Sequence, residues 1–132
     1  MRRLAAALLL AATAGGCNAA GEPDGSKRFS DSDVPFTFEL PADFTKASVD
    51  DQNSRGDVIA GAGLSKVDVI AVRRASAAGA GGPHEVLGRR VTSELRPVPG
   101  FAGWVLECQY TPAFATKVRD ACRDAVASVR PK

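Results

Sequence analysis

Apolar and polar residues alternate along several stretches of the chain, and this spacing of two predicts β-strands. Residues 34–40 carry apolar side chains at every second position, so we expect a half-buried strand that Pro41 ends. Two further strands are predicted over residues 57–64 and 66–74, and the second is apolar on both faces, as in a central strand. A fourth strand is predicted over residues 104–110.

A spacing of three and four, which is typical of helices, follows this last strand. Thr111 is suited to cap a helix and Pro112 to occupy its first position. The apolar residues of one helical face are Phe114, Val118, Ala121, Cys122, Ala125 and Val129. We therefore expect a C-terminal helix that covers the sheet.

A second, shorter helix is predicted over residues 83–95. Leu87, Val91 and Leu95 lie four residues apart, whereas Gly88 weakens the helix. The element order is then strand, strand, strand, helix, strand, helix. This order predicts the α+β class, with an antiparallel or mixed sheet of about four strands packed by two helices.

The stretch PFTFELPADF resembles the opening motif of PsbP-like domains. The matching residues are Phe36, Phe38, Glu39 and Pro41, and Phe44 stands where that motif favours tryptophan. The resemblance implies an α/β/α sandwich, shared with bacterial lipoprotein relatives, that works as an accessory or assembly protein through its surface. It carries over no site residues.

The first residues have the form of a secretory signal. Arg2 and Arg3 precede an uncharged apolar run over residues 4–14, and two glycines follow it. The run has 11 residues, whereas a helix that spans a membrane needs about 20, so we expect export.

Two processing outcomes compete at the end of this signal. The small residues Ala12 and Ala14 fit ordinary cleavage after Ala14, which releases a soluble secreted protein. The small residues before Cys17 resemble the lipobox of bacterial lipoproteins, although Ala14 stands where that family most often has leucine. This resemblance implies a diacylglycerol thioether on Cys17 and a stable anchor on the extracytoplasmic face of the cell membrane.

On the lipoprotein interpretation, the chain has three parts. Residues 1–16 are a signal peptide, residues 17–33 are a lipidated N-terminus with a flexible polar tether, and residues 34–132 form a single globular domain. Removal of the signal also removes Arg2 and Arg3, which leaves 15 basic residues against 15 acidic ones. A neutral mature chain gives no electrostatic reason to expect nucleic acid as a partner.

The number of cysteines favours acylation of Cys17. Three thiols in an exported chain leave one without a partner, but an acylated Cys17 leaves Cys108 and Cys122 as an even pair. Both residues lie on the inward faces of their predicted strand and helix. We therefore expect a disulfide that closes a loop of about 15 residues and contributes about 3 kcal/mol. Two buried, reduced thiols are the alternative.

Local motifs give little chemistry, and we expect no metal and no cofactor. His84 is the single histidine and is expected to be solvated in the first turn of the shorter helix. Asp51, Asn53 and Gly56 have the spacing of the start of a calcium loop, but Ala62 stands where the bidentate glutamate belongs, so we expect a polar loop. Motifs of serine hydrolases, zinc peptidases and P-loop proteins are absent from the sequence.

Two hypotheses of different classes remain. The first is a non-catalytic lipoprotein domain that binds an envelope protein or a small apolar or lipid ligand. The second is a small envelope hydrolase or transferase that uses carboxylates such as Glu39, Glu85 or Glu107. We favour the first, which requires an apolar patch or pocket, whereas the second requires a cleft with at least two interacting ionisable groups.

Overall fold

The computed structural model describes residues 25–47 and 58–132, and the chain there folds into two antiparallel sheets and one α-helix. The larger sheet contains, in spatial order, β4 (Thr45–Lys46), β5 (Val58–Gly63), β6 (Val69–Arg74), β9 (Trp104–Tyr110), β8 (Arg89–Pro97) and β7 (Gly82–Val86). The smaller sheet contains β10 (Arg130–Pro131), β3 (Phe36–Pro41) and β2 (Ser26–Phe29). The helix is α2 (Ala115–Ala127), and two short 3-10 turns are η3 (Ala75–Ala77) and η4 (Pro112–Phe114).

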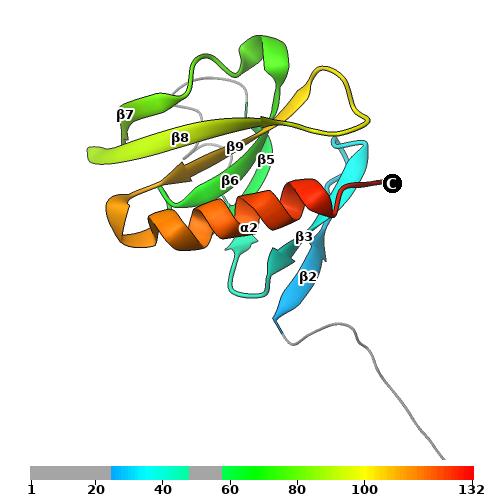
Figure 1. The fold of residues 1–132 in the computed structure, drawn as a ribbon, viewed down its shortest axis with the longest axis horizontal. Helices are drawn as coiled ribbons and strands as arrows, with labels where there is room; N and C mark the ends of the chain where they lie inside the picture. The colour runs from blue at the N-terminus through cyan, green and yellow to red at the C-terminus, as the bar shows by residue number, and fades with distance from the viewer. Residues whose placement is uncertain (1–24, 48–57) are drawn as a thin grey trace, which may run out of the picture.

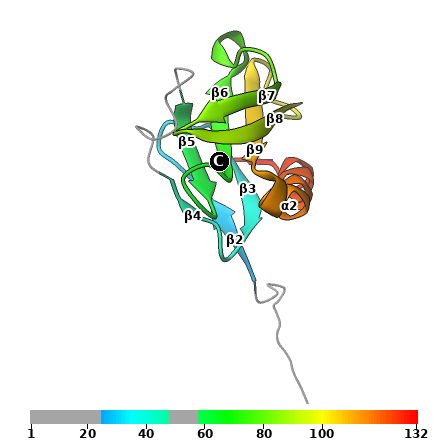
Figure 2. The same ribbon diagram turned by 90° about the vertical axis from the view of Figure 1, so that its left-hand side faces the viewer.

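Helix α2 packs against β9 of the larger sheet and β3 of the smaller sheet (Figures 1 and 2). Its buried stripe consists of Val118, Ala121, Cys122 and Ala125. The shared core also contains the buried rings of Phe36 and Phe38 from β3 and the side chain of Leu106 from β9. Both sheets and the helix therefore bury their apolar faces in one core.

Several local predictions are confirmed. The strands predicted over residues 34–40, 57–64, 66–74 and 104–110 correspond to β3, β5, β6 and β9. The predicted C-terminal helix is present as η4 followed by α2. These segments were recognisable because their apolar positions match the period of the structure that they form.

The predicted fold class is wrong. The part of the chain described here contains nine strands in two sheets and one α-helix, instead of about four strands packed by two helices. The α/β/α sandwich that the PsbP-like resemblance implied is not formed either, because α2 is the one α-helix on the two sheets within the described residues.

The predicted helix over residues 83–95 is a β-hairpin made of β7 and β8. Leu87 (φ 51°) and Gly88 (φ 76°) connect the strands, and two successive positive φ values are typical of the tight turns of hairpins. A spacing of four places residues on one helical face, but it also places them on one face of a strand. The pattern was therefore ambiguous, and the positive φ of Gly88 resolves it in favour of a turn.

The folded region also begins earlier than residue 34. Strand β2, which falls in the segment assigned to the tether, pairs with β3 over its whole length, and Phe29 lies in the core. The rings of Phe29 and Phe38 stack with their centroids 4.8 Å apart. A single aromatic residue in a polar segment gave no periodic signal, and the strand depends on its partner β3.

Cys108 on β9 and Cys122 on α2 lie at disulfide distance, with their Cα atoms 6.1 Å apart. Both side chains are buried between the sheet and the helix. The pairing expected from the inward faces of the two elements is therefore present, and it ties α2 to the central part of the larger sheet. Cys17 and the calcium-like stretch of residues 51–56 lie outside the described residues.

A candidate ligand-binding hollow

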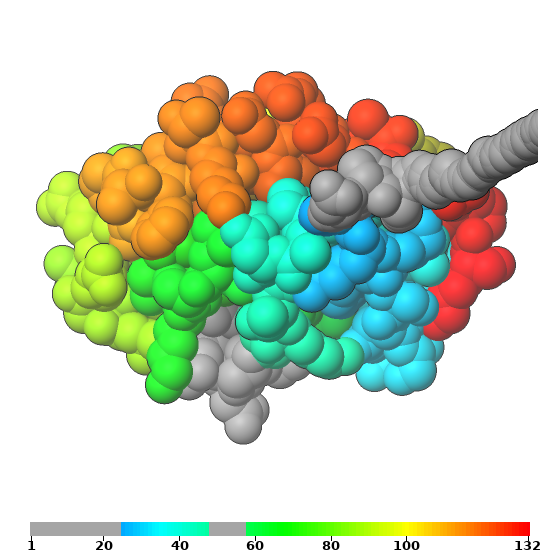
Figure 3. Space-filling view, turned by 90° about the horizontal axis from the view of Figure 1, so that it is seen from below, coloured from blue at the N-terminus to red at the C-terminus, as the bar shows by residue number. Residues whose placement is uncertain are grey.

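A hollow of about 190 Å³ opens where the smaller sheet meets the edge of the larger one. We call it the apolar hollow. It is lined by Lys27, Arg28, Phe29, Ser30, Leu40, Phe44, Lys46 and Ala62. Strand β2 and the segment around β4, which supply most of this lining, lie side by side on one face of the molecule (Figure 3).

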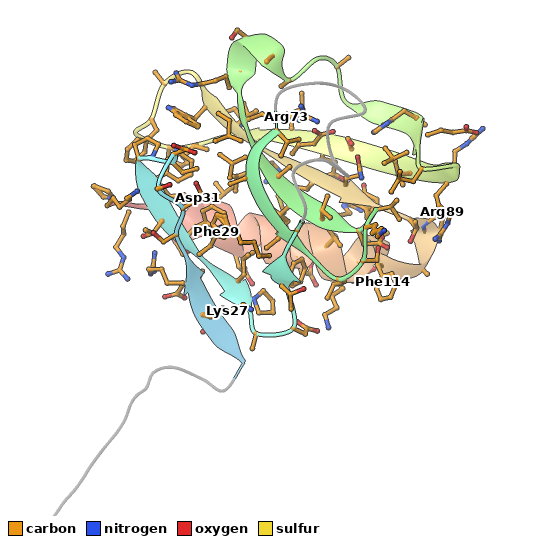
Figure 4. The ribbon with its side chains drawn as sticks, turned by 180° about the vertical axis from the view of Figure 1, so that it is seen from behind. Lys27, Phe29, Asp31, Arg73, Arg89 and Phe114 are labelled. Carbon is orange, nitrogen blue, oxygen red and sulfur yellow. A yellow bond between two sulfur atoms is a disulfide. The ribbon has the colours of Figure 1, made fainter. Side chains whose placement is uncertain are left out.

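Strand pairing places an apolar floor beneath cationic side chains in this hollow. Lys27 of β2 lies opposite Leu40 of β3, and Lys46 of β4 lies opposite Ala62 of β5. Leu40, Phe44 and Ala62 are buried, whereas Lys27 and Lys46 are exposed. Each lysine therefore stands beside apolar surface at the mouth of the hollow, and Figure 4 shows Lys27 and Phe29 on the same strand.

The cations around the apolar hollow differ in their partners. Lys46 pairs with Asp31 at 3.1 Å, and Arg28 pairs with Glu39 at 2.9 Å on the neighbouring strand. Lys27 has no ion pair with any residue in the described ranges 25–47 and 58–132. Its ammonium group is therefore the cation at this hollow that is available to an anionic ligand.

Asp31 holds Lys46 in place. The backbone N–H of Asp33 donates to Asp31 Oδ1 at 2.9 Å, and this hydrogen bond is the main reason why the pKa of Asp31 is lowered. Burial opposes the lowering, and the charge of Lys46 adds to it. Asp31 therefore stays ionised at neutral pH and neutralises Lys46.

A second hollow, of about 270 Å³, lies between β8 and α2 and has a different lining. We call it the arginine hollow. Its lining residues are Arg96, Thr116, Arg119, Asp120 and Arg123. The three guanidinium groups face carboxylates: Arg119 lies 2.9 Å and Arg96 4.0 Å from Glu94, and Arg123 lies 3.1 Å from Asp120.

Tyr110 helps to position the arginine hollow. Its hydroxyl donates a hydrogen bond to Glu94, the carboxylate that pairs with Arg119 and Arg96. Burial raises the pKa of Tyr110, and the nearby Glu94 carboxylate raises it further. The tyrosine therefore remains a neutral donor, and Glu94 in turn holds Arg119. The charges of the arginine hollow are largely satisfied within the protein.

His84 does not lie in the first turn of a helix, as the sequence predicted, but on the edge strand β7. Its Nε2 atom lies 2.7 Å from Ser93 Oγ on β8. A serine beside a histidine can be a nucleophile and its base, but Ser93 is only 2% exposed. A substrate has no access to a hydroxyl at that depth, so we interpret the contact as a link between the two strands of the hairpin.

The three candidate carboxylates are not brought together. Glu39 lies on β3 of the smaller sheet, whereas Glu85 and Glu107 lie on β7 and β9, with β8 between them. Glu107 forms a buried ion pair with Arg73, and both side chains are 2% exposed. Within residues 25–47 and 58–132, no group of three histidine, cysteine or acidic side chains is arranged to hold a metal ion.

The glycines of β5 have a packing explanation. A Cβ atom at Gly61 would lie 3.0 Å from the carbonyl oxygen of Ile70, and one at Gly63 would lie 2.6 Å from that of Asp68. A side chain at Gly63 would therefore clash with the neighbouring backbone, and one at Gly61 would fit only after a small shift of β6.

Comparison of the chain with protein families, curated proteins and solved structures finds no match. None of the helices in the described part of the chain is long and apolar enough to cross a membrane.

Proposed function

We propose that the chain is an exported lipoprotein, anchored through an acylated Cys17 at the extracytoplasmic face of a membrane. Its folded domain binds a small amphiphile, with the apolar tail in the apolar hollow and an anionic head against Lys27. The observation that carries the proposal is the combination of an apolar floor with a cation that has no ion-pair partner among the described residues.

The floor favours a short apolar tail. Each methylene group that leaves water contributes about 0.8 kcal/mol, or about a fourfold gain in affinity. At about 190 Å³ the hollow is smaller than the roughly 300–1,000 Å³ that is usual for drug-sized ligands. It therefore fits the end of an alkyl chain rather than a bulky ring system.

The mouth of the hollow favours an anionic head. Lys46 and Arg28 are already paired with carboxylates, so a negative head gains most from Lys27. A neutral head of the same size gains the apolar contribution alone. Charge should therefore discriminate between ligands that have identical tails.

Anchoring is supported by the sequence. Residues 4–14 are too short to span a membrane, small residues precede Cys17, and Cys108 and Cys122 lie at disulfide distance from each other. This pairing leaves Cys17 as the remaining cysteine. Acylation would remove the remaining thiol and supply two hydrophobic chains.

Calorimetric titration of the mature chain with hexyl, octyl and decyl sulfate, below the concentrations at which they form micelles, tests ligand binding. We expect affinity to rise about fourfold for each added methylene until the hollow is full. Octyl glucoside, which has the same tail as octyl sulfate and a neutral head, should bind more weakly. Equal affinities for all three sulfates, or no binding of any of them, would rule out the proposed ligand class.

Intact-protein mass spectrometry of the membrane fraction from a bacterial host tests the anchor. We expect a product that begins at Cys17 and carries acyl chains, and a Cys17→Ser variant that lacks them. A soluble product that begins at Gly15 with a free Cys17 thiol would contradict the anchor, but it would leave the ligand proposal intact.

A further inference from the structure

Two large apolar side chains stand out on the surface of the described residues. Leu87 is 55% exposed and Phe114 is 41% exposed, whereas the other large apolar side chains described are buried or half-buried. Leu87 lies at the tip of the β7–β8 hairpin, and Phe114 lies just before α2. Figure 1 shows the hairpin tip and the start of α2 at the same end of the molecule, and Figure 4 shows Arg89 and Phe114 there.

Leu87 is unfavourable for the isolated domain in two ways. Its φ of 51° is in the left-handed region, where glycine and asparagine are preferred and a branched side chain is strained. Its side chain is also 55% exposed and belongs to neither core cluster of the described residues. Strain held at an exposed position outside the core points to a function outside the fold.

The charges beside Leu87 indicate which kind of partner would contact it. Arg89 and Arg90 follow after Gly88, are exposed, and make no ion pair with any described residue. Glu85 is the cross-strand neighbour of Arg90, so the tip retains a positive charge. Exposed apolar side chains beside arginines are typical of segments that enter an anionic lipid surface.

We propose that this end of the domain, defined by Leu87, Arg89, Arg90 and Phe114, inserts into the surface of an anionic lipid bilayer. A stable protein interface buries about 1,200–2,000 Å², far more than two side chains supply. Shallow insertion into lipid requires only a few apolar side chains, with headgroup phosphates beside the guanidinium groups. This inference is independent of the apolar hollow, because none of the four residues lines it.

Sedimentation of the mature chain with lipid vesicles tests the insertion. The protein carries Cys17→Ser, so that no acyl chain contributes, and the vesicles contain either phosphatidylglycerol with phosphatidylcholine or phosphatidylcholine alone. We expect preferential binding to the anionic vesicles, and weaker binding at higher salt concentration. Leu87→Gly should weaken this binding about tenfold.

The same Leu87→Gly variant separates function from folding. Glycine accepts a positive φ without strain, so we expect its melting temperature to rise by about 4 °C while lipid binding falls. Arg89→Gln with Arg90→Gln should weaken binding to the anionic vesicles by more than tenfold. Arg119→Gln with Arg123→Gln removes the same charge from α2 and should leave binding within twofold of the parent protein.

Three results would overturn the inference. They are the absence of sedimentation with anionic vesicles, equal binding to both kinds of vesicle, and undiminished binding of the Leu87→Gly variant. Each of these leaves the titration with alkyl sulfates unaffected, since that titration reports on a different part of the surface.

Discussion

The apolar hollow and the arginine hollow are similar in volume, at about 190 and 270 Å³, but their linings differ. The first places buried apolar side chains beneath Lys27, which has no ion-pair partner among the described residues. The second places three guanidinium groups beside carboxylates with which they already form ion pairs. A ligand in the first covers apolar surface and meets an available charge, whereas a ligand in the second must compete with existing ion pairs. Volume alone therefore does not indicate which hollow binds.

Filling each hollow with a leucine side chain should produce the largest difference in ligand affinity between the two hollows. Leucine at position 62 would occupy the floor of the apolar hollow and displace two or three methylenes of a bound tail. We expect Ala62→Leu to weaken octyl sulfate binding about thirtyfold, or ~2 kcal/mol. Thr116→Leu adds a leucine to the arginine hollow and should leave affinity unchanged. Calorimetry measures both affinities, and circular dichroism checks that each variant is folded.

Unchanged affinity in the folded Ala62→Leu variant would place the ligand elsewhere. A loss of affinity in the Thr116→Leu variant would assign binding to the arginine hollow instead.

Reversing one charge at each hollow should give the next largest difference in ligand affinity. Lys27→Glu removes the available cation and places a negative charge near the ligand head. We expect affinity for octyl sulfate to fall about tenfold, and affinity for octyl glucoside to change little. Arg123→Glu makes the same change in charge beside the arginine hollow and should have no effect on either ligand. Equal losses for the sulfate and the glucoside would show that Lys27 contributes through packing rather than charge.

Tyr110 tests whether the arginine hollow is held together by internal hydrogen bonds. Tyr110→Phe removes the hydrogen bond to Glu94, so we expect the free energy of unfolding at pH 7 to fall by about 1 kcal/mol. Because the pKa of Tyr110 is raised in the fold, its contribution is full below pH 10 and is lost as the pH rises through the folded-state value.

The difference between parent and Tyr110→Phe should therefore shrink above about pH 10. Denaturant unfolding measures it at each pH. Tyr110 is the only tyrosine in the chain, so the absorbance of tyrosinate follows this one group directly. A constant difference across the alkaline range would contradict the account of Tyr110.

Substitution of Asp31 should produce the smallest effect on ligand affinity and on the free energy of unfolding. Asp31→Asn releases Lys46 and makes a second cation available at the apolar hollow, so affinity for octyl sulfate should rise about threefold. The substitution should also lower the free energy of unfolding by about 0.5 kcal/mol at neutral pH. The pKa of Asp31 is lowered in the fold, so its stabilisation is present above the ordinary value of 3.8 and is lost as the pH falls through the folded-state value. A gap in stability that persists at pH 2 would contradict this assignment.

Much of the fold was predictable because its signals are local. Strand β9 and the stripe on α2 each repeat with the period of their own element, and their inward faces also predicted that Cys108 and Cys122 would meet. The β7–β8 hairpin differs from the predicted helix because Val91 and Leu95, four residues apart, share a face on a strand as well as on a helix, whereas Leu87 lies in the turn between the strands. Only the turn at Gly88 distinguishes the two, through backbone geometry that a spacing does not contain.

The apolar hollow was not predictable from sequence patterns. Its lining comes from four strands and the segments between them, and strand pairing across two sheets brings them together. Lys27 lies in a segment whose composition resembles a tether, and it acquires its place only because β2 pairs with β3. Its availability depends on where Asp31 and Glu39 lie after folding, which the order of residues does not state.

Titration of the isotopically labelled mature chain with octyl sulfate, followed residue by residue through amide chemical shifts, tests the central claim most directly. The account predicts that the largest shifts occur at Lys27, Phe29, Ser30 and Lys46, and that the amides of Thr116 and Arg123 stay in place. Shifts confined to the residues of the arginine hollow, or no shifts at any concentration below micelle formation, would contradict it.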